Sequence, residues 1–505
     1  MEKTDRRIFA ASFAAIVATA FCFILRALVI DDWGREFALS ETQKGELLGV
    51  GLWPFSISIV LLSLVIDRIG FRATLWFAAA CHLAGLVVLL TAHGYWALYG
   101  GTFTMALGNG AVEAAANPLI ATVFRHDKPR WLNRLHAGWL GGLILGGLVA
   151  LTLGAEAGWR VKYALLVLPV LAYVLILIGS RFPVSERVAS GTSYRAMLVE
   201  AGFVSAGIIL LLIMLEVGRI AGLPGWAVIV LVASLTAAFG AAARSAGRPL
   251  YIVLLLIMIP LAITELSTDS WISSLMEPEM HAVGLQAGWV LVYTSAIVFA
   301  IRIFAGSIIH WLQPLPVLAL ASALAAVGLF MLSGSTGLAL LLAATLYGIG
   351  KSFFWGTSLG VCSEQFPAGG ALTINAMAGA GMLAAGIVGS VFLGAAQDRA
   401  TEAALLERDA RQGTHLAELY LTGTKVSVFG QYRALDQAKL AAAGAEDRDL
   451  VEAIRRDSKK TALTDVAKLP LGMVAAYLGL IVYFRLRGGY RPVILPHLPA
   501  GSVNP

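Results

Sequence analysis

Apolar stretches of about twenty residues alternate along this chain with short polar connections. An α-helix rises about 1.5 Å per residue, so each stretch is long enough to cross the ~30 Å hydrocarbon core of a bilayer. The pattern therefore predicts an all-α, polytopic membrane protein with about fourteen spans. The predicted spans are residues 8–30, 47–66, 74–92, 96–123, 135–155, 162–180, 203–220, 225–243, 251–272, 287–309, 316–333, 338–361, 373–396 and 470–486.

The first six and the last six spans repeat one another, with two extra spans between them. Residues 43–67 align without gaps on residues 286–310, at an offset of 243 positions that pairs Gln43 with Gln286. Two helical halves related by an axis along the membrane normal are a transporter architecture. We therefore expect the chain to form two six-helix halves around an inserted pair of helices.

The predicted division has three parts and one insertion. Residues 1–183 form the N-terminal half, residues 184–248 a linker with a two-helix hairpin, and residues 249–505 the C-terminal half. Residues 397–469, between the last two spans, are rich in charge and have helical amphipathic patterns. We expect them to form a small helical cap outside the cytoplasm. A passive insertion and a gating or partner-binding element both remain open interpretations.

Composition and charge agree with a membrane protein. The chain is 58% hydrophobic and 13% charged, whereas soluble domains carry about 25% charged residues. Its net charge of +6 does not indicate a nucleic-acid partner, because Lys and Arg concentrate in alternate short loops, as membrane topology requires. This distribution predicts that both termini are cytoplasmic and that the protein lies in the plasma (inner) membrane.

Motifs for catalysis are missing from the sequence. It contains no Walker loop, no H-E-x-x-H, no G-x-S-x-G and no set of residues with metal-ligand spacing. We therefore expect neither an enzyme nor an ATP-driven pump, and no cofactor other than a coupling ion, a proton or possibly sodium. The expected partners are a small solute and the lipid bilayer, and a monomer is sufficient for function.

The connection between the second and third spans reads LSLVIDRIGFRATL at residues 62–75. It places Asp67, Arg68, Gly70 and Arg72 on a tight turn, which a glycine permits. A carboxylate at a helix end beside cationic side chains can hold neighbouring helices in one arrangement. These four residues are our candidates for a conformational gate loop.

This loop resembles the signature of the major facilitator superfamily, G-x-x-x-D-R-x-G-R-R/K. Ser63 stands at the first glycine position here, and Phe71 replaces the first base of the final pair. The resemblance extends over nearly all of the twelve core spans. It implies the major facilitator fold and transport by alternating access.

A polar stripe runs along the fourth span. Asn109, Glu113 and Asn117 are four residues apart and share one helix face. An ionised carboxylate at this depth costs at least ~3 kcal/mol, so it must be paired, hydrated or protonated. Glu113 is thus either a coupling and substrate-binding acid or the partner of Arg26 in a structural ion pair.

The stretches GAVEAAANPLIATVF (110–124) and LNRLHAGWLGG (132–142) resemble the sugar-porter branch that includes fucose and glucose/galactose permeases. Glu113 matches a glutamate that is implicated there in proton coupling and sugar binding. Asn117 and Asn133 match asparagines of spans four and five. Those permeases carry an aspartate in span one, where this chain has Arg26.

The second half has its own charged residues within predicted spans. Glu265 and Asp269 share a face of span seven and are either proton-coupling acids or solvated rim residues. Arg302 in span eight and Lys351 in span ten are buried cations, which usually face a cavity or an acid. Trp355, one turn beyond Lys351, is a candidate cavity wall.

Together these residues predict a secondary active transporter that moves a small polar solute, with a sugar taken up by proton symport as the first hypothesis. An organic-anion or phosphate-bearing solute carrier that uses Arg26, Arg302 and Lys351 is an alternative. A transporter-derived solute sensor is another. The expected sites are substrate binding by Asn109, Glu113, Asn117, Asn133, Lys351, Trp355 and Asn375, proton coupling by Glu113, Glu265 and Asp269, and charge pairing by Arg26 and Arg302.

Overall fold

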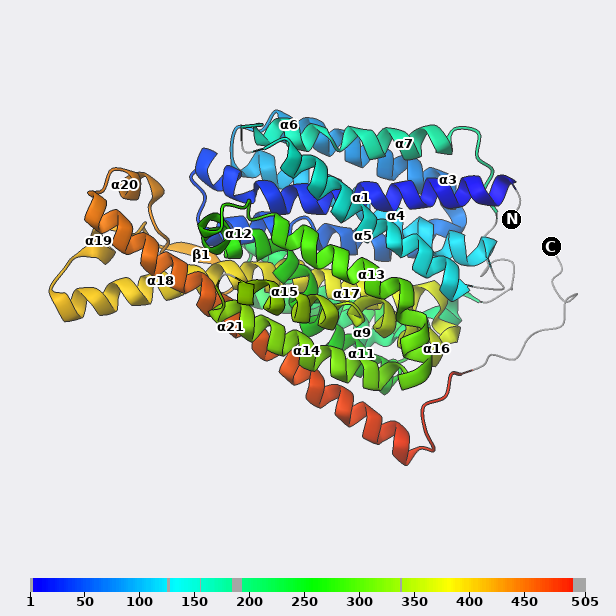
Figure 1. The fold of residues 1–505 in the computed structure, drawn as a ribbon. Helices are drawn as coiled ribbons and strands as arrows, with labels where there is room; N and C mark the ends of the chain where they lie inside the picture. Colours follow the sequence, from blue (N-terminus) through cyan, green and yellow to red (C-terminus); the bar gives the residue numbers. More distant parts are fainter. Residues whose placement is uncertain (1–2, 125–127, 155, 184–192, 337, 494–505) are drawn as a thin grey trace, which may run out of the picture.

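The protein is a bundle of long helices from which two helices project at one end (Figure 1). This computed structural model describes residues 3–124, 128–154, 156–183, 193–336 and 338–493. Among them, twelve helical segments are long and apolar enough to cross a membrane. Each of the fourteen predicted spans coincides with one or more helices, so the predicted all-α membrane architecture is confirmed.

Seven helical segments make up the described part of the N-terminal half. The second predicted span is interrupted, because α2 ends at Gly49 and α3 begins at Trp53 with Pro54 in its first turn, a position that proline favours. The segments are α1 (Lys3–Glu36), α2 (Glu41–Gly49), α3 (Trp53–Leu90), α4 (Tyr95–Val123), α5 (Lys128–Thr152), α6 (Trp159–Ala164) and α7 (Val167–Leu177).

The C-terminal half contains two π-helical segments that the hydropathy pattern does not reveal. They are η1 (Ile263–Ser267) and η3 (Ala384–Gly389), and each continues an α-helix on both sides. The other segments are α11 (Pro249–Ala262), α12 (Thr268–Ala282), α13 (Trp289–Leu312), α14 (Pro314–Gly334), α15 (Leu338–Lys351), α16 (Phe354–Gln365), the 3-10 turn η2 (Pro367–Gly369), α17 (Gly370–Leu383), α18 (Ser390–Gln412) and α21 (Ala445–Leu486).

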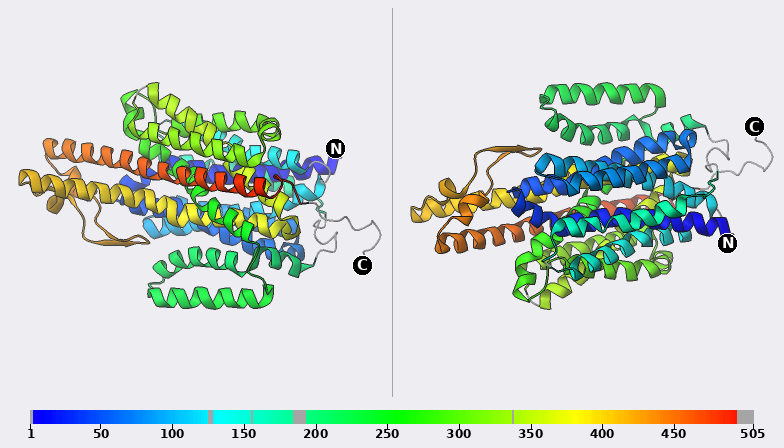
Figure 2. Two further views of the ribbon diagram at one scale, coloured as in Figure 1. Left: turned by 90° about the horizontal axis from the view of Figure 1, so that it is seen from below. Right: turned by 90° about the horizontal axis from the view of Figure 1, so that it is seen from above.

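The cap consists mainly of extensions of two membrane helices. α18 and α21 run past the bundle at the end opposite to the start of α1, as Figures 1 and 2 show. We call this the cap end and the opposite one the terminus end. The tip of the cap carries the short helices α19 (Leu416–Tyr420) and α20 (Gln437–Ala441). Between them the chain returns to the bundle in a β-hairpin, β1 (Lys425–Ser427) and β2 (Gly430–Tyr432), that the sequence pattern did not predict.

The inserted hairpin, α9 (Tyr194–Ile220) and α10 (Gly225–Ala243), lies at the side of the bundle (Figure 2). α9 packs against α17 of the C-terminal half, and its end is tied to the N-terminal half by charge. Arg219 pairs with Glu216 at 2.7 Å, as the three-residue spacing predicts, and with Glu46 of α2 at 3.1 Å. The hairpin therefore contacts both halves.

The two halves approach each other very closely near the cap end. A Cβ atom placed on Gly45 of α2 would lie 2.6 Å from the carbonyl oxygen of Ser390, and one on Gly49 would overlap the carbonyl oxygen of Gly386. Only glycine lets backbones come this close. The seam between α2 and the η3–α18 segment is thus a direct backbone contact between the halves.

Candidate functional site

A buried ion pair joins two helices of the C-terminal half. Lys351, at the end of α15, makes a short contact with Asp269 of α12, and both residues are almost fully buried. The Tyr347 hydroxyl donates to Thr264 O at 2.9 Å and lies 3.4 Å from Asp269 Oδ1. Lys351 therefore faces an acid, one of the two arrangements its sequence position allows.

A second ion pair lies beside the first. Arg302 of α13 approaches Glu265 at 3.3 Å and donates from Nε to Ser352 O at 3.2 Å. The predicted role of Arg302 as a buried charge partner agrees with this contact. The other Glu265 oxygen, Oε2, is buried and has no hydrogen-bond partner among the described residues. Glu265 is thus buried, and the sequence-based alternative of a solvated rim residue does not describe it.

The π-helical segment η1 presents these acids. Glu265 lies within η1, and Asp269 follows in the first turn of α12. π-Helical segments occur frequently at functional sites. Pro260 in α11 lacks an N–H and so disturbs regular helical bonding just before η1; this is the one sequence signal that could have indicated the irregularity.

In the N-terminal half, Glu113 of α4 accepts a hydrogen bond from its own helix. Asn117 Nδ2 donates to Glu113 Oε2 at 2.7 Å. Among the described residues, no Lys or Arg lies within ion-pair distance of this buried carboxylate. The acid and the amide of the predicted stripe are therefore one polar unit.

Arg26 does not reach Glu113, so its predicted role as a charge partner is wrong within the described part of the chain. Its buried guanidinium lies against Gly51, at the α2–α3 junction, and 5.6 Å from the Phe23 ring centroid. Its Nε has no hydrogen-bond partner among the described residues. The guanidinium therefore lies at the break between α2 and α3.

Asn109 belongs to a polar cluster inside the N-terminal half. Its Oδ1 lies 2.9 Å from His82 Nε2, and the other ring nitrogen of His82 lies 3.0 Å from the Tyr173 hydroxyl. All three residues are buried or nearly so, which leaves the amide oxygen of Asn109 occupied. The sequence analysis missed His82, although a single histidine in an apolar span is a visible signal.

The remaining candidates lie nearer the terminus end. Gly70 has φ +81°, which agrees with the predicted turn, and Arg68 and Arg72 are exposed. Trp355 is half-buried at the start of α16. The side chains of Asp67 and Asn133 lie outside the described residues, so the roles predicted for them remain predictions.

Asn375 of α17 joins the halves through the residue that replaces the first signature glycine. Its Nδ2 donates to Ser63 Oγ of α3 at 2.6 Å, and Ser63 Oγ in turn lies 2.6 Å from Ile59 O. Both residues are buried. The asparagine predicted to bind substrate thus bonds across the seam between the halves.

Replacing Ser63 with alanine should favour opening at the terminus end, because it removes this bond and leaves the Asn375 amide unpaired. A hydrogen bond of this kind contributes about 1 kcal/mol, so opening should become roughly fivefold more frequent. In a chain whose native cysteines are replaced by alanine, the labelling rate of Ala376→Cys by a maleimide reports the opening. Ser333→Ala, whose hydroxyl donates to Phe330 O of its own helix, should leave the rate unchanged. Equal rates in both variants would contradict the expectation.

Two helical halves that meet along a seam, with ion pairs buried among membrane-spanning helices, define a membrane transport protein. The chain matches the family model of the Major Facilitator Superfamily over residues 8–392 and belongs to that family. It is therefore a multi-pass membrane protein of a family of transporters.

Solved structures share this fold at low sequence identity. The inward-open xylose transporter XylE from E. coli is 16% identical, with a TM-score of 0.56 over 77% of this chain and 89% of that one. An inward-facing bacterial homologue of the human lysosomal transporter Spinster is 13% identical, with a TM-score of 0.65 over 98% and 100% of the two chains. A bacterial homologue of human drug peptide transporters is 11% identical, with a TM-score of 0.60 over 95% and 99%.

Proposed function

We propose that this transporter moves a small neutral polar solute together with protons, and that a sugar or polyol is the solute to test first. The observation that carries the proposal is the charge balance of the site in the C-terminal half. Arg302 and Lys351 each face an acid, Glu265 and Asp269. A site whose cations are already neutralised favours a neutral solute over an anion, because an anion would have to displace a paired carboxylate.

Glu113 is the proposed coupling acid. It is buried, its described polar partner is the neutral amide of Asn117, and no described cation balances its charge. The ionised form is costly at this depth. A proton taken up from one side would neutralise the carboxylate while the halves rock, and its release on the other side would reset the carrier.

Glu265 is the proposed second proton site. One of its oxygens has no described partner, and the contact of the other with Arg302 is longer than the Asp269–Lys351 contact. Protonation of Glu265 would release Arg302 and leave the tighter pair intact. A sugar hydroxyl could then occupy the unpartnered oxygen. One structural neighbour is described as a D-xylose-proton symporter, which makes this chemistry a reasonable first test.

A second candidate function rests on Arg26. This buried guanidinium has no acidic partner among the described residues, and an organic anion would supply one. In this alternative, Arg26→Gln would abolish transport of the anion, and neutral sugars would not be carried.

The test uses the full protein in liposomes that contain a pH-sensitive dye, with sugars, polyols, peptides and organic anions added in turn. For wild type we expect a neutral solute to trigger proton entry. Glu113→Gln should lose this proton entry by at least tenfold yet still exchange labelled for unlabelled solute, since the fixed neutral form can still change conformation. Glu407→Gln, an exposed acid of the cap, is the control.

Each of the other outcomes leads to a different conclusion about the function of this protein. Unchanged proton entry in Glu113→Gln would reject the proposed coupling acid. Flux of organic anions alone, lost in Arg26→Gln, would establish the second candidate. Solute binding without flux would indicate a sensor.

A further inference from the structure

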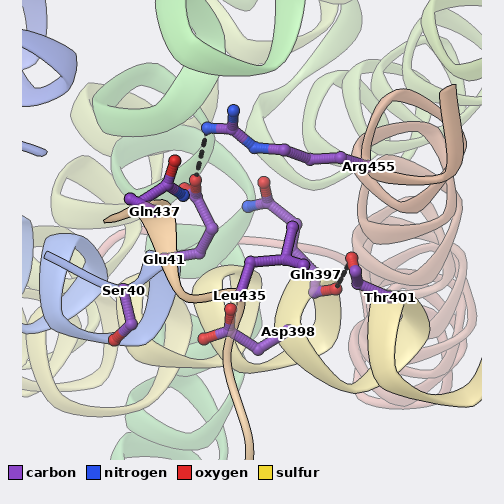
Figure 3. Close-up of a pocket in the computed structure, with 8 residues that line it drawn as sticks. All are labelled: Ser40, Glu41, Gln397, Asp398, Thr401, Leu435, Gln437 and Arg455. Carbon is purple, nitrogen blue, oxygen red and sulfur yellow. Dashed lines mark hydrogen bonds and ion pairs between the residues drawn. The ribbon is translucent and has the colours of Figure 1, made fainter. Parts of the chain in front are cut away.

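The cap meets both halves of the bundle at a small polar cavity. Its lining combines the α1–α2 corner of the N-terminal half with α18, the start of α20 and the segment before it, and α21 (Figure 3). The residues shown are Ser40, Glu41, Gln397, Asp398, Thr401, Leu435, Gln437 and Arg455. Residues more than 350 positions apart thus share one cavity.

The first contact is ionic and joins α21 to the N-terminal half. Arg455 of α21 donates to Glu41 at 2.9 Å (Figure 3). Lys44, which is almost fully buried, lies 2.8 Å from the other Glu41 oxygen and makes a short contact with Asp31 of α1. The cap arginine therefore completes a buried charge cluster of the N-terminal half.

The second contact extends this cluster to the C-terminal half. Lys459, one turn after Arg455, donates to Ser274 O at 2.8 Å and lies 3.3 Å from Glu277, both of α12. The Ser274 hydroxyl donates to Asp31 at 2.9 Å. α21 thus contacts α2 through Arg455 and α12 through Lys459. α12 is in turn hydrogen-bonded to α1.

The third contact uses the start of α2. Asp398 of α18 accepts from Thr42 N at 2.9 Å and from Thr42 Oγ1 at 2.6 Å. The first N–H groups of a helix lack partners within the helix and attract a carboxylate. Ser40, the N-cap of α2, lies 3.2 Å from the Tyr432 hydroxyl of β2. The cap thereby binds both the side chain and the backbone of this corner.

We propose that the cap is a clamp that holds the cap end of the transporter closed. Its contacts with Glu41, Thr42 and Ser40 hold the N-terminal half, while α18 and α21 are continuous with membrane helices of the C-terminal half. Separating the halves at this end would therefore break all these bonds together.

Charge balance makes the clamp sensitive to single substitutions. Asp31, Glu41 and Glu277 face Lys44, Arg455 and Lys459, and the more exposed Arg35 and Glu452 add one base and one acid, so acids and bases balance among them. Loss of one base leaves a surplus carboxylate that is stable only in water. Opening of the cap end would let water hydrate this carboxylate. A variant that lacks one base should therefore favour the open state.

The test measures distances between spin labels at the exposed positions His93 and Val283, which lie at the cap end of the N- and C-terminal halves. The full chain, with its native cysteines replaced, is labelled and studied without solute. Arg455→Gln should increase the population with the longer distance at least fivefold. Arg411→Gln removes an exposed cap arginine that pairs with Glu407 of the same helix, and should leave the distances unchanged.

Two further variants keep the test decisive if Arg455→Gln folds poorly. Glu41→Gln should also lengthen the distance, because it breaks the pair with Arg455 and leaves that arginine only the more exposed Glu452 of its own helix among the described acids. The double variant Glu41→Gln with Arg455→Gln removes one acid and one base together, so it leaves no surplus charge and should bring the distribution back toward wild type. Distances that stay the same in Arg455→Gln and Glu41→Gln would overturn the clamp. The result is independent of proton coupling, since neither solute nor gradient is present.

Discussion

Replacement of Lys351 with methionine should abolish transport and strongly destabilise the protein. The change leaves the Asp269 carboxylate buried without its cation, and breaking a buried pair in this way costs about 3–5 kcal/mol. The double variant Asp269→Asn with Lys351→Met removes both charges and should recover most of the stability. It should not recover transport if the pair is part of the moving network.

Thermal unfolding in detergent and solute uptake in liposomes measure the two effects separately. Lys468→Met is the control, because Lys468 is exposed and pairs with Asp465 one turn away in the same helix; such pairs contribute little. A single variant as stable as wild type would contradict this expectation. The pair would then have no structural role.

Gly49→Ala should reduce transport at least tenfold by keeping the halves apart at the cap end. The added methyl group would overlap the carbonyl oxygen of Gly386, which is backbone and cannot rotate away. Overpacking of this kind typically costs about 1–3 kcal/mol, and here the strain exists only while α2 and η3 are in contact. The variant should therefore fold and remain in the state open at the cap end.

The His93–Val283 label pair and an uptake assay together check this expectation. Gly100→Ala is a matched control, because a Cβ on this helical glycine has nothing within 4 Å. A Gly49→Ala protein that transports normally would show that the seam does not need so close an approach during the cycle.

The sequence predicted the spans well because hydropathy and length alone decide whether a helix can cross a bilayer. The Glu216–Arg219 pair also follows from local spacing, since residues three apart lie on one helix face. For Lys351 and Arg302 the sequence offered two options, an acid or a cavity. The packing of η1, α12, α13 and α15 shows that each of these cations faces an acid.

Other features depend on contacts between distant segments and leave little trace in a local pattern. The position of Arg26 against Gly51 depends on how α1 crosses the α2–α3 break. The bond of Asn375 to Ser63 joins residues 312 positions apart. For the η1 segment the sequence contains one weak signal, Pro260. The β-hairpin of the cap contains polar residues, and its hydropathy does not distinguish it from a loop.

The cap also provides a binding surface outside the bilayer through which the transporter can be inhibited. It is joined to the C-terminal half by two continuous helices, α18 and α21, and its tip stands clear of the bundle (Figure 1). A nanobody raised against α19 and α20 would bind the folded surface of this tip. By stiffening the joint between the cap and the α1–α2 corner, such a binder would act as a noncompetitive inhibitor that never enters the membrane.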